Sequence, residues 1–277
     1  MPDALRLALG TFTAVRVPAP RTVDRRTAGR AMLLAPLVGA LLGVAVAAVV
    51  AAVRISDTAL RPAATVDLLA AVLGVVALAL LTRGMHLDGL ADLADATGVK
   101  GDDAGARERR LAVMREPSVG AFGVVAIVLT LLVQIAALTE CAISGYGTVA
   151  TVTAVTTARL AVTWSCVRGT PSARPDGLGA LVAGTVPRPA AVLETVAVVV
   201  GAAVLGQLDD DRAVQMSLTL AASVLVALAV AWFVRRRAVR LLGGITGDVL
   251  GAVVEVTTAA ALVAIAFGSG LYLPGLG

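Results

Sequence analysis

Seven apolar stretches, each close to the length of a membrane-crossing helix, divide this chain of 277 residues. About 20 mostly apolar residues are enough for a helix to cross a bilayer. With a mean hydropathy of +0.91 and 58% hydrophobic residues, a soluble domain would expose far too much apolar surface. We therefore expect an all-α, polytopic integral membrane bundle with about seven transmembrane helices, at residues 32–53, 66–82, 120–139, 146–164, 189–206, 213–234 and 249–268.

The distribution of arginine and lysine predicts how this bundle is oriented. If the chain alternates through seven spans, 20 of its 23 basic residues fall on one side of the membrane. Basic residues are enriched in cytoplasmic loops. We therefore expect a single domain, residues 1–277, in the cytoplasmic (inner) membrane, with its N-terminus in the cytoplasm. On that side we place the interfacial segment 1–31, a catalytic loop at 83–118, and the loops 165–188 and 235–248.

The segment from Thr82 to Phe122 concentrates seven acidic residues, six basic residues and the only histidine. Within it, Asp88, Asp92 and Asp95 recur at spacings that place three carboxylates on one face of a helix. Such close like charges repel each other unless a cation lies between them. Oxygen ligands without a cysteine or histidine cluster suit Mg²⁺ or Mn²⁺. The pattern predicts a Mg²⁺ site that serves phosphoryl-type transfer; an acidic helix end that merely faces water remains the alternative.

Several neighbouring residues add to this prediction. Gly89 directly follows Asp88, and its missing side chain would let a phosphate or a metal approach the backbone. Asp248 and Glu255 lie seven residues apart at the start of the last apolar stretch, where unpaired carboxylates are costly. Asp248 is the stronger candidate because it lies at the cytoplasmic mouth. His86 suits a structural hydrogen bond as well as proton transfer.

The arginines of ARERRLAVMRE are expected on an amphipathic helix, where they could clamp the pyrophosphate of a nucleotide. A planar guanidinium offers paired donors to phosphate. The alternative is a loop whose positive charge only orients the protein in the membrane. A second polar cluster, PSARPDGLG, contributes another arginine. The expected substrate-binding residues are Arg83, Arg107, Arg109, Arg115, Glu116, Arg159 and Arg174.

Five motifs, HLDGLADLADA, RERRLAVM, VGAFG, PSARPDGLG and LGGITGDVLGAVVE, follow one another in this chain. In this order they resemble the motifs of the cobalamin synthase family, the adenosylcobinamide-GDP ribazoletransferases. The opening LGTFTAVRVPAP and PLVGALLG resemble that family too, so the resemblance covers essentially the whole chain. It implies a membrane transferase that needs a divalent cation, normally Mg²⁺. Such an enzyme joins GDP-activated adenosylcobinamide to α-ribazole, or to its 5′-phosphate, and releases GMP.

Carried over by position, the resemblance implies that Asp88, Asp92 and Asp95 are the acidic metal-site residues of the first motif, with His86 beside them, and that Arg174 and Asp248 match polar positions of later motifs. We expect Asp248 to join the metal ligands. Asp88, Asp92 and His86 are the expected catalytic residues, and the choice of proton acceptor between an aspartate and His86 is open. The chain departs from the family where Ala96 follows Asp95, since many members have glycine there. It departs again where Glu116 and Ser118 stand in a KDSR-like run, so no arginine role is assigned at Ser118.

Two other function classes are open from the residues alone. A CDP-alcohol phosphotransferase-like enzyme also uses spaced aspartates at a membrane surface, but its DxxDGxxAR pattern is not met here. A small-solute transporter would line a path with residues such as Asp248, Glu255 and Arg159, yet most acids gather in long loops. We expect small-molecule substrates, a lipid bilayer, no cofactor besides Mg²⁺ and no nucleic acid. A homo-oligomer stays open.

Overall fold

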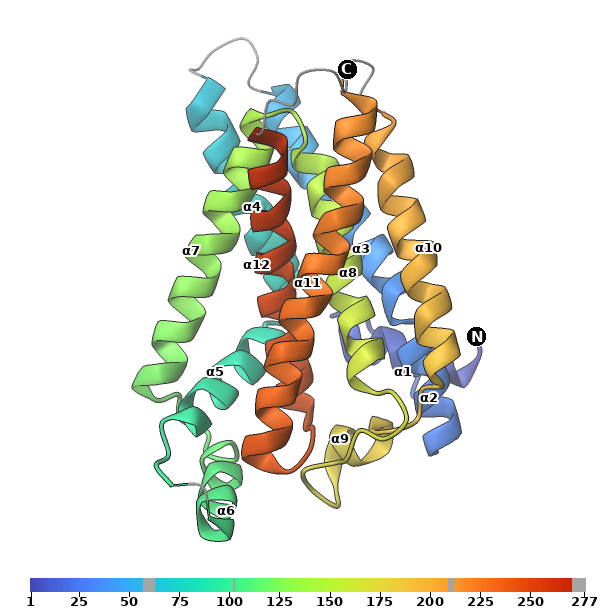
Figure 1. Cartoon of the computed structure of the whole chain (residues 1–277), viewed down its shortest axis with the longest axis vertical. Helices are drawn as coiled ribbons and strands as arrows, with labels where there is room; N and C mark the ends of the chain where they lie inside the picture. The colour runs from blue at the N-terminus through green and yellow to red at the C-terminus, as the bar shows by residue number, and fades with distance from the viewer. Residues whose placement is uncertain (57–62, 102, 209–211, 271–277) are drawn as a thin grey trace.

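The computed structural model describes residues 1–56, 63–101, 103–208 and 212–270 (Figure 1). Over these residues the regular structure consists of helices, and the only strand-like pairings are two isolated parallel bridges. The expectation of an all-α bundle is confirmed.

Long helices run along the bundle, and their bounds follow the apolar stretches of the sequence. They are α3 (Ala35–Ser56), α4 (Ala63–Leu81), α7 (Ala121–Ile143), α8 (Gly147–Ser165), α10 (Arg188–Gly206), α11 (Ala213–Leu242) and α12 (Gly247–Gly270). The short helices lie at one end of the bundle, together with the polar loops (Figure 1). They are α1 (Asp3–Phe12), α2 (Arg25–Leu33), α5 (Met85–Thr97), α6 (Ala104–Val113) and α9 (Gly177–Val182). We call this the polar end of the bundle.

Within the described residues, five helices are long and apolar enough to cross a membrane, namely α3, α7, α10, α11 and α12. The pair of α4 and α5 meets the same criterion only when taken together, and its two halves are bent by 89°. The structure therefore supports five or six candidate spans by length and composition. The count of seven crossings and the cytoplasmic position of the N-terminus stay predictions.

Helix α8 differs from the other long helices because it is rich in threonine. It lies inside the bundle, where most of its residues are buried. The hydroxyls of Thr151, Thr156 and Thr157 each donate to the carbonyl four residues earlier at 2.7 Å. Small residues on α3 allow a close approach, since a Cβ at Gly39 would lie 2.9 Å from the carbonyl oxygen of Val155. A moderately polar helix is thereby accommodated without facing lipid.

A sharp turn between α4 and α5 creates the platform of the polar end. Arg83, with φ of 54°, is the one non-glycine residue of the described chain in the left-handed region, and Gly84 follows with φ of 66°. Two consecutive left-handed residues turn the chain by 89°, so that α5 runs across the polar end of the bundle and does not continue the line of α4. The Arg83 guanidinium donates to the carbonyl oxygen of Thr13 at 3.4 Å, which ties this turn to the N-terminal segment.

Backbone hydrogen bonds fasten the loop between α8 and α9 to the turn between α11 and α12. The amide of Ala173 donates to the carbonyl of Ile245 at 3.0 Å, and the amide of Ile245 donates to the carbonyl of Pro171 at 2.9 Å. Gly244 permits this pairing, because a Cβ there would fall on the backbone between Ser172 and Ala173. The loop of residues 171–176 is therefore held beside the start of α12.

The N-terminal segment packs onto the polar end as well. The carboxylate of Asp3 accepts from the amides of Arg21 and Thr22, at 3.0 and 3.2 Å. Arg25 donates to the carbonyl of Ala183 at 2.6 Å, which joins α2 to the end of α9. Helix α1 has a buried apolar face, and its Ala8 and Phe12 lie in the core.

Candidate active site

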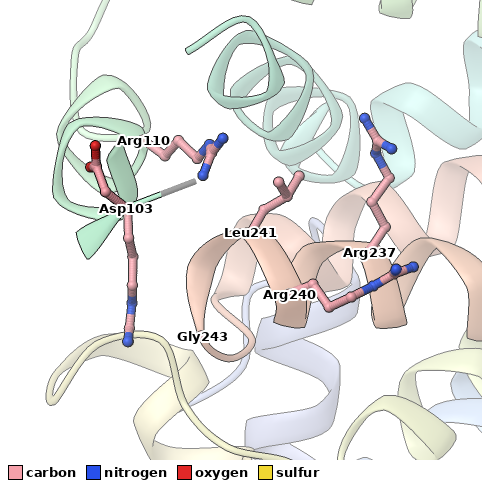
Figure 2. A pocket seen from close by; sticks show the side chains of 7 residues that line it. Asp103, Arg110, Arg237, Arg240, Leu241 and Gly243 are labelled. Carbon is pink, nitrogen blue, oxygen red and sulfur yellow. The ribbon is translucent and has the colours of Figure 1, made fainter. Parts of the chain in front are cut away.

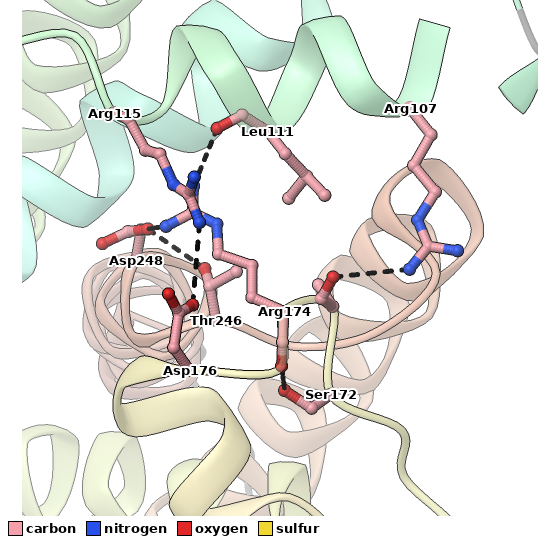
Figure 3. Close-up of polar contacts among 9 residues, drawn as sticks. Arg107, Leu111, Arg115, Ser172, Arg174, Asp176, Thr246 and Asp248 are labelled. Atoms are coloured by element: carbon pink, nitrogen blue, oxygen red, sulfur yellow. Dashed lines mark hydrogen bonds and ion pairs between the residues drawn. The ribbon is translucent and has the colours of Figure 1, made fainter. Parts of the chain in front are cut away.

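Four polar side chains from three segments meet where α5 crosses the start of α12. Asp88 and Asp92 come from α5, Asp248 from the first turn of α12, and Arg174 from the loop of residues 171–176. Nη1 of Arg174 lies 4.0 Å from Oδ2 of Asp248 (Figure 3). We call these four residues the acidic site. Residues that the sequence placed in separate motifs are thus neighbours in the fold.

Hydrogen bonds on both sides hold the Asp248 and Arg174 pair. The hydroxyl of Thr246 donates to Oδ2 of Asp248 at 3.1 Å and accepts from the amide of Val249 at 3.2 Å. Nη2 of Arg174 donates to the carbonyl oxygen of Leu111 at 3.0 Å (Figure 3). Helix α6, which carries Leu111, is therefore connected to the acidic site through this arginine.

Two glycines let α5 and α12 touch at this point. A Cβ on Gly89 would lie 2.6 Å from the carbonyl oxygen of Asp248, and one on Gly251 would lie 3.1 Å from the Cα of His86. The reason given for Gly89 from the sequence was wrong: the space beside it is filled by the backbone of Asp248 and does not admit a phosphate or a metal. Close packing of the two helices is what brings Asp248 to Asp88 and Asp92.

The carboxyl group of Asp92 has a raised pKa of about 6. Partial burial is the main cause, followed by the negative charges of Asp248, Asp88 and Asp95, while Arg174 acts in the opposite direction. Crowded carboxylates of this kind are stabilised by a bound cation. The α5 aspartates therefore lie near one another, as their spacing predicted, and their charges influence the pKa of Asp92.

Asp95 has a different environment from the other predicted metal ligands. Its Oδ2 accepts from the amide of Gly120 at 2.7 Å, and its Oδ1 accepts from the amide of Gly123 at 2.8 Å. Both oxygens thus bind the free amides at the start of α7, a favourable position for a carboxylate. Over the described chain, no three histidine, cysteine or acidic side chains are grouped closely enough to hold one ion. In this structure at most two of the carboxylates of Asp88, Asp92 and Asp248 are therefore close enough to share one ion, and both oxygens of Asp95 already bind backbone amides.

A cavity of about 230 Å³ opens beside the acidic site. Asp88, Asp248 and His86 contribute its polar groups, and apolar side chains form much of its wall. Thr11 and Phe12 of α1 also line it, although the sequence had placed this helix only at the membrane interface. The apolar periodicity of α1 was visible in the sequence, but nothing there linked its buried face to residues near position 88 or 248. The apolar lining residues are Phe12, Met85, Val162, Leu178, Leu250 and Val254.

His86 and Arg159 are buried below the acidic site. Burial, and to a lesser degree the charge of Arg159, lowers the pKa of His86 to about 3, so this imidazole is neutral at physiological pH. Its Nδ1 has no hydrogen-bond partner among the described residues. Arg159 is fully buried within α8, near Glu255, whose carboxylate accepts from Gln134 at 2.9 Å. Arg159 is not among the residues that line the cavity, whereas His86 is.

The remaining predicted substrate residues are spread over the polar end. Arg107 donates to the carbonyl of Ala173 at 3.4 Å, and Arg115 forms a largely exposed ion pair of 3.6 Å with Asp176 (Figure 3). Nη2 of Arg109 in α6 lies 3.9 Å from Oδ1 of Asp103, which caps the same helix. The exposed side chain of Glu116 makes no hydrogen bond or ion pair with another described residue. Arg83 belongs to the turn before α5, so the fold gathers only part of the predicted set around Asp248.

A second pocket, of about 530 Å³, lies between α6 and the last turns of α11. Figure 2 shows Arg110 on one side of Leu241 and Arg237 on the other, with Arg240 below. We call it the basic pocket. Arg237 and Arg240 were not among the predicted site residues. The sequence signal was the arginine run at 235–237 and Arg240, in a loop that was expected on the same side as the catalytic loop. The lining residues are Asp103, Arg107, Arg110, Arg237, Arg240, Leu241 and Gly243.

Comparison with known proteins agrees with the order of the motifs. Residues 4–266 match the model of the family described as cobalamin-5-phosphate synthase (CobS). A relative from Frankia casuarinae, named adenosylcobinamide-GDP ribazoletransferase, is 44% identical over 262 residues, or 94% of this chain and 93% of the relative.

Two further relatives carry the same name. The relative from a Nocardioides species is 42% identical over 268 residues, or 95% of this chain and 98% of its own length. The relative from Pseudomonas aeruginosa is 36% identical over 270 residues, or 96% of this chain and 100% of its own length. No solved structure is significantly similar to the chain. A family model that matches nearly the whole chain, and relatives that match it at full length, lead to one conclusion: this chain belongs to the cobalamin-5-phosphate synthase family.

Proposed function

We propose that this protein transfers the adenosylcobinamide-phosphate moiety of adenosylcobinamide-GDP to α-ribazole, or to α-ribazole 5′-phosphate, and releases GMP. The observation that carries the proposal is the meeting of Asp88, Asp92, Asp248 and Arg174 beside a cavity at the polar end of a membrane bundle. Its membership of a family whose relatives are named for this reaction supports it. No observation favours a CDP-alcohol phosphotransferase or a transporter over this reaction.

The reaction requires one bond to form and one to break at a single phosphorus. A ribose hydroxyl of α-ribazole attacks the phosphorus attached to the cobinamide side. The bond from that phosphorus to the bridging oxygen breaks, and GMP leaves with the electron pair. The hydroxyl proton passes to a carboxylate of the acidic site or to the neutral imidazole of His86, both of which face the same cavity. Arg174 stands where negative charge develops on the phosphoryl oxygens.

The acidic site fits a Mg²⁺ ion in its donor set. Asp88, Asp92 and Asp248 provide carboxylate oxygens only, and Mg²⁺ usually takes one or two carboxylates, with water and substrate phosphates completing its shell. The pKa of Asp92 is raised mainly by partial burial and further by the carboxylates of Asp248, Asp88 and Asp95, whose combined negative charge a cation would relieve. When bound, Mg²⁺ would neutralise charge on the pyrophosphate oxygens. Asp95 would support this site indirectly, because its carboxylate holds the start of α7.

The orientation of the site is part of the proposal. The loops with the highest density of arginine gather at the polar end, together with the acidic site and the basic pocket (Figure 1). An excess of basic residues marks the cytoplasmic side of membrane proteins. We place the active site at the cytoplasmic face of the cytoplasmic membrane, where a nucleotide-activated substrate is available.

The experiment that tests the function measures GMP release by the purified full chain in detergent or nanodiscs. The assay contains adenosylcobinamide-GDP and α-ribazole, with Mg²⁺ or with EDTA. We expect release that needs both substrates, is abolished by EDTA and is restored by added Mg²⁺. We expect Asp88→Asn to lower the rate by at least about 100-fold, in the range found when a group that stabilises the transition state is removed.

Gly201→Ala provides a matched control for handling of the protein, because a Cβ on this exposed glycine of α10 would meet no atom within 4 Å. A well-folded wild type that releases no GMP in the presence of Mg²⁺ would refute the function. GMP release unaffected by EDTA would support the transferase activity but refute its dependence on Mg²⁺.

A further inference from the structure

The lining of the basic pocket is rich in arginine. Four guanidinium groups, from Arg107, Arg110, Arg237 and Arg240, share it with one carboxylate, that of Asp103. The Asp103 carboxylate already accepts from the amide of Ala106 at 2.6 Å, where it caps α6. Arginine therefore predominates over acidic residues in the described lining of the pocket.

Arg237 and Arg240 are available to a ligand. Both side chains are exposed, and neither guanidinium forms a hydrogen bond or an ion pair with any residue in the described part of the chain. Their neighbour Arg236 is different, because its guanidinium lies 4.9 Å from the centre of the Trp232 ring. One helix thus presents two uncommitted arginines to the pocket and a third to an aromatic surface.

The opposite wall of the pocket is built to keep its charge in place. Arg110 is buried, and its guanidinium donates to the carbonyls of Val99 and Gly101, at 3.2 and 2.5 Å. Arg107 lies over Gly243, which has φ of 79°, and a Cβ at that glycine would fall on the guanidinium. Rigid positioning of arginines favours bidentate recognition of phosphate.

The basic pocket borders the acidic site through a single short loop. Arg107 lines the pocket and donates to the carbonyl of Ala173, and the next residue, Arg174, reaches Asp248 (Figure 3). A nucleotide-activated ligand whose reacting phosphate lies near Asp248 could therefore extend its nucleoside end toward the arginines of α6 and α11. The volume of about 530 Å³ lies within the range of about 300–1,000 Å³ that is usual for small-molecule sites.

We propose that the basic pocket binds the nucleoside-phosphate half of the nucleotide-activated substrate, so that the released nucleoside monophosphate departs from arginines of α6 and α11. This inference rests on the proposed function, and it adds that the leaving group, the nucleoside monophosphate, is bound in the basic pocket. Arg237 and Arg240 are then substrate-binding residues, although they lie more than 120 positions from the α5 aspartates. The phosphorus that reacts lies at the acidic site, next to Arg174.

A direct binding experiment tests the pocket without turnover. The affinity of GMP for the full chain in nanodiscs of neutral lipid is measured for the wild type and for Arg237→Gln, Arg240→Gln and Arg236→Gln. We expect each pocket variant to weaken GMP binding roughly tenfold or more, as for loss of a charge-assisted hydrogen bond. Arg236→Gln removes the same charge one residue away and should leave the affinity within about twofold, since exposed charges contribute little. Melting temperatures close to that of the wild type show that the variants are folded.

Other results overturn the inference. Equal weakening by Arg236→Gln would mean that net charge alone attracts GMP, and unchanged GMP affinity in Arg237→Gln and Arg240→Gln would mean that the pocket does not bind nucleotide. A lipid headgroup is tested by repeating the measurement with phosphatidylglycerol in the nanodiscs. Loss of lipid binding in the pocket variants, with GMP affinity intact, would assign the pocket to lipid and refute the proposal.

Failure of the function is a separate outcome. A wild-type protein that binds GMP through Arg237 and Arg240 but catalyses no transfer would refute the proposed reaction, and nucleotide binding in the basic pocket would still be supported. If Arg237→Gln and Arg240→Gln turn over adenosylcobinamide-GDP with an unchanged KM, nucleotide binding in the basic pocket is refuted and the proposed reaction is still supported.

Discussion

Gly89 of α5 lies against the backbone of Asp248 in α12, so closely that a Cβ on the glycine would be 2.6 Å from the carbonyl oxygen and 2.7 Å from the Cα of that aspartate. No flexible side chain is available to yield, because the opposing atoms belong to the backbone. We expect Gly89→Ala to push α5 away from α12 and to lower the transfer rate by about 100-fold, the effect of displacing a reacting group by about 1 Å. The rate of GMP release measures this, with Gly201→Ala as the control. A variant with wild-type activity would show that the contact does not set the geometry of the site.

We expect Asp92 to determine how the reaction depends on pH. Its pKa is raised to about 6, so the carboxyl group is largely protonated below that value and must lose its proton before it can bind a cation. The apparent affinity for Mg²⁺ should therefore fall as the pH is lowered from 7.5 through 6, because the Asp92 carboxyl group becomes protonated. Titrations of the rate with Mg²⁺ at several pH values measure this. Asp92→Asn should weaken Mg²⁺ at pH 7.5 and abolish the pH dependence near 6; an unchanged profile would contradict the assignment.

Asp95 should affect stability more than metal binding. Its two oxygens accept from the amides of Gly120 and Gly123 at the start of α7, and losing a helix cap usually costs about 0.5–2 kcal/mol. We expect Asp95→Ala to lower the melting temperature while the Mg²⁺ concentration for half-maximal rate stays near that of the wild type. Asp88→Asn should show the opposite pattern. If Asp95→Ala instead raises the Mg²⁺ requirement strongly at unchanged stability, Asp95 is a metal ligand.

Arg174 and Arg115 provide a matched pair of arginines on the same face of the polar end. Arg174 is mostly buried and contacts both Asp248 and the Leu111 carbonyl, whereas Arg115 forms an exposed ion pair with Asp176. Arg174→Gln should reduce the rate by about 100-fold through loss of a donor at the reacting phosphate. Arg115→Gln should change the free energy of unfolding by less than about 1 kcal/mol. Equal losses of activity in both variants would show that the general positive charge matters rather than the position of Arg174.

Several features of this protein could be read from its sequence because they depend on residues near one another in the chain. Apolar runs of bilayer length predicted the long helices, since a backbone in lipid must satisfy its hydrogen bonds within one segment. The spacing of Asp88 and Asp92 predicted a shared helix face, because α-helical periodicity is local. The ordered motifs indicated the family. The gathering of the polar loops at one end followed from an alternating path through the bundle (Figure 1).

The tertiary structure decided what depends on contacts between distant segments. Gly89 is small because the backbone of Asp248 lies against it, and Asp95 is bonded to amides at Gly120 and Gly123, which no spacing within the motif could reveal. Phe12 likewise lines the cavity because tertiary packing brings α1 next to residues far away in the sequence. The sequence by itself determined which segments are helical, which family they form and which α5 carboxylates share a face. Only packing decided which carboxylates remain open to a ligand and that arginines of α11 join those of α6, because long-range contacts place them and local periodicity does not.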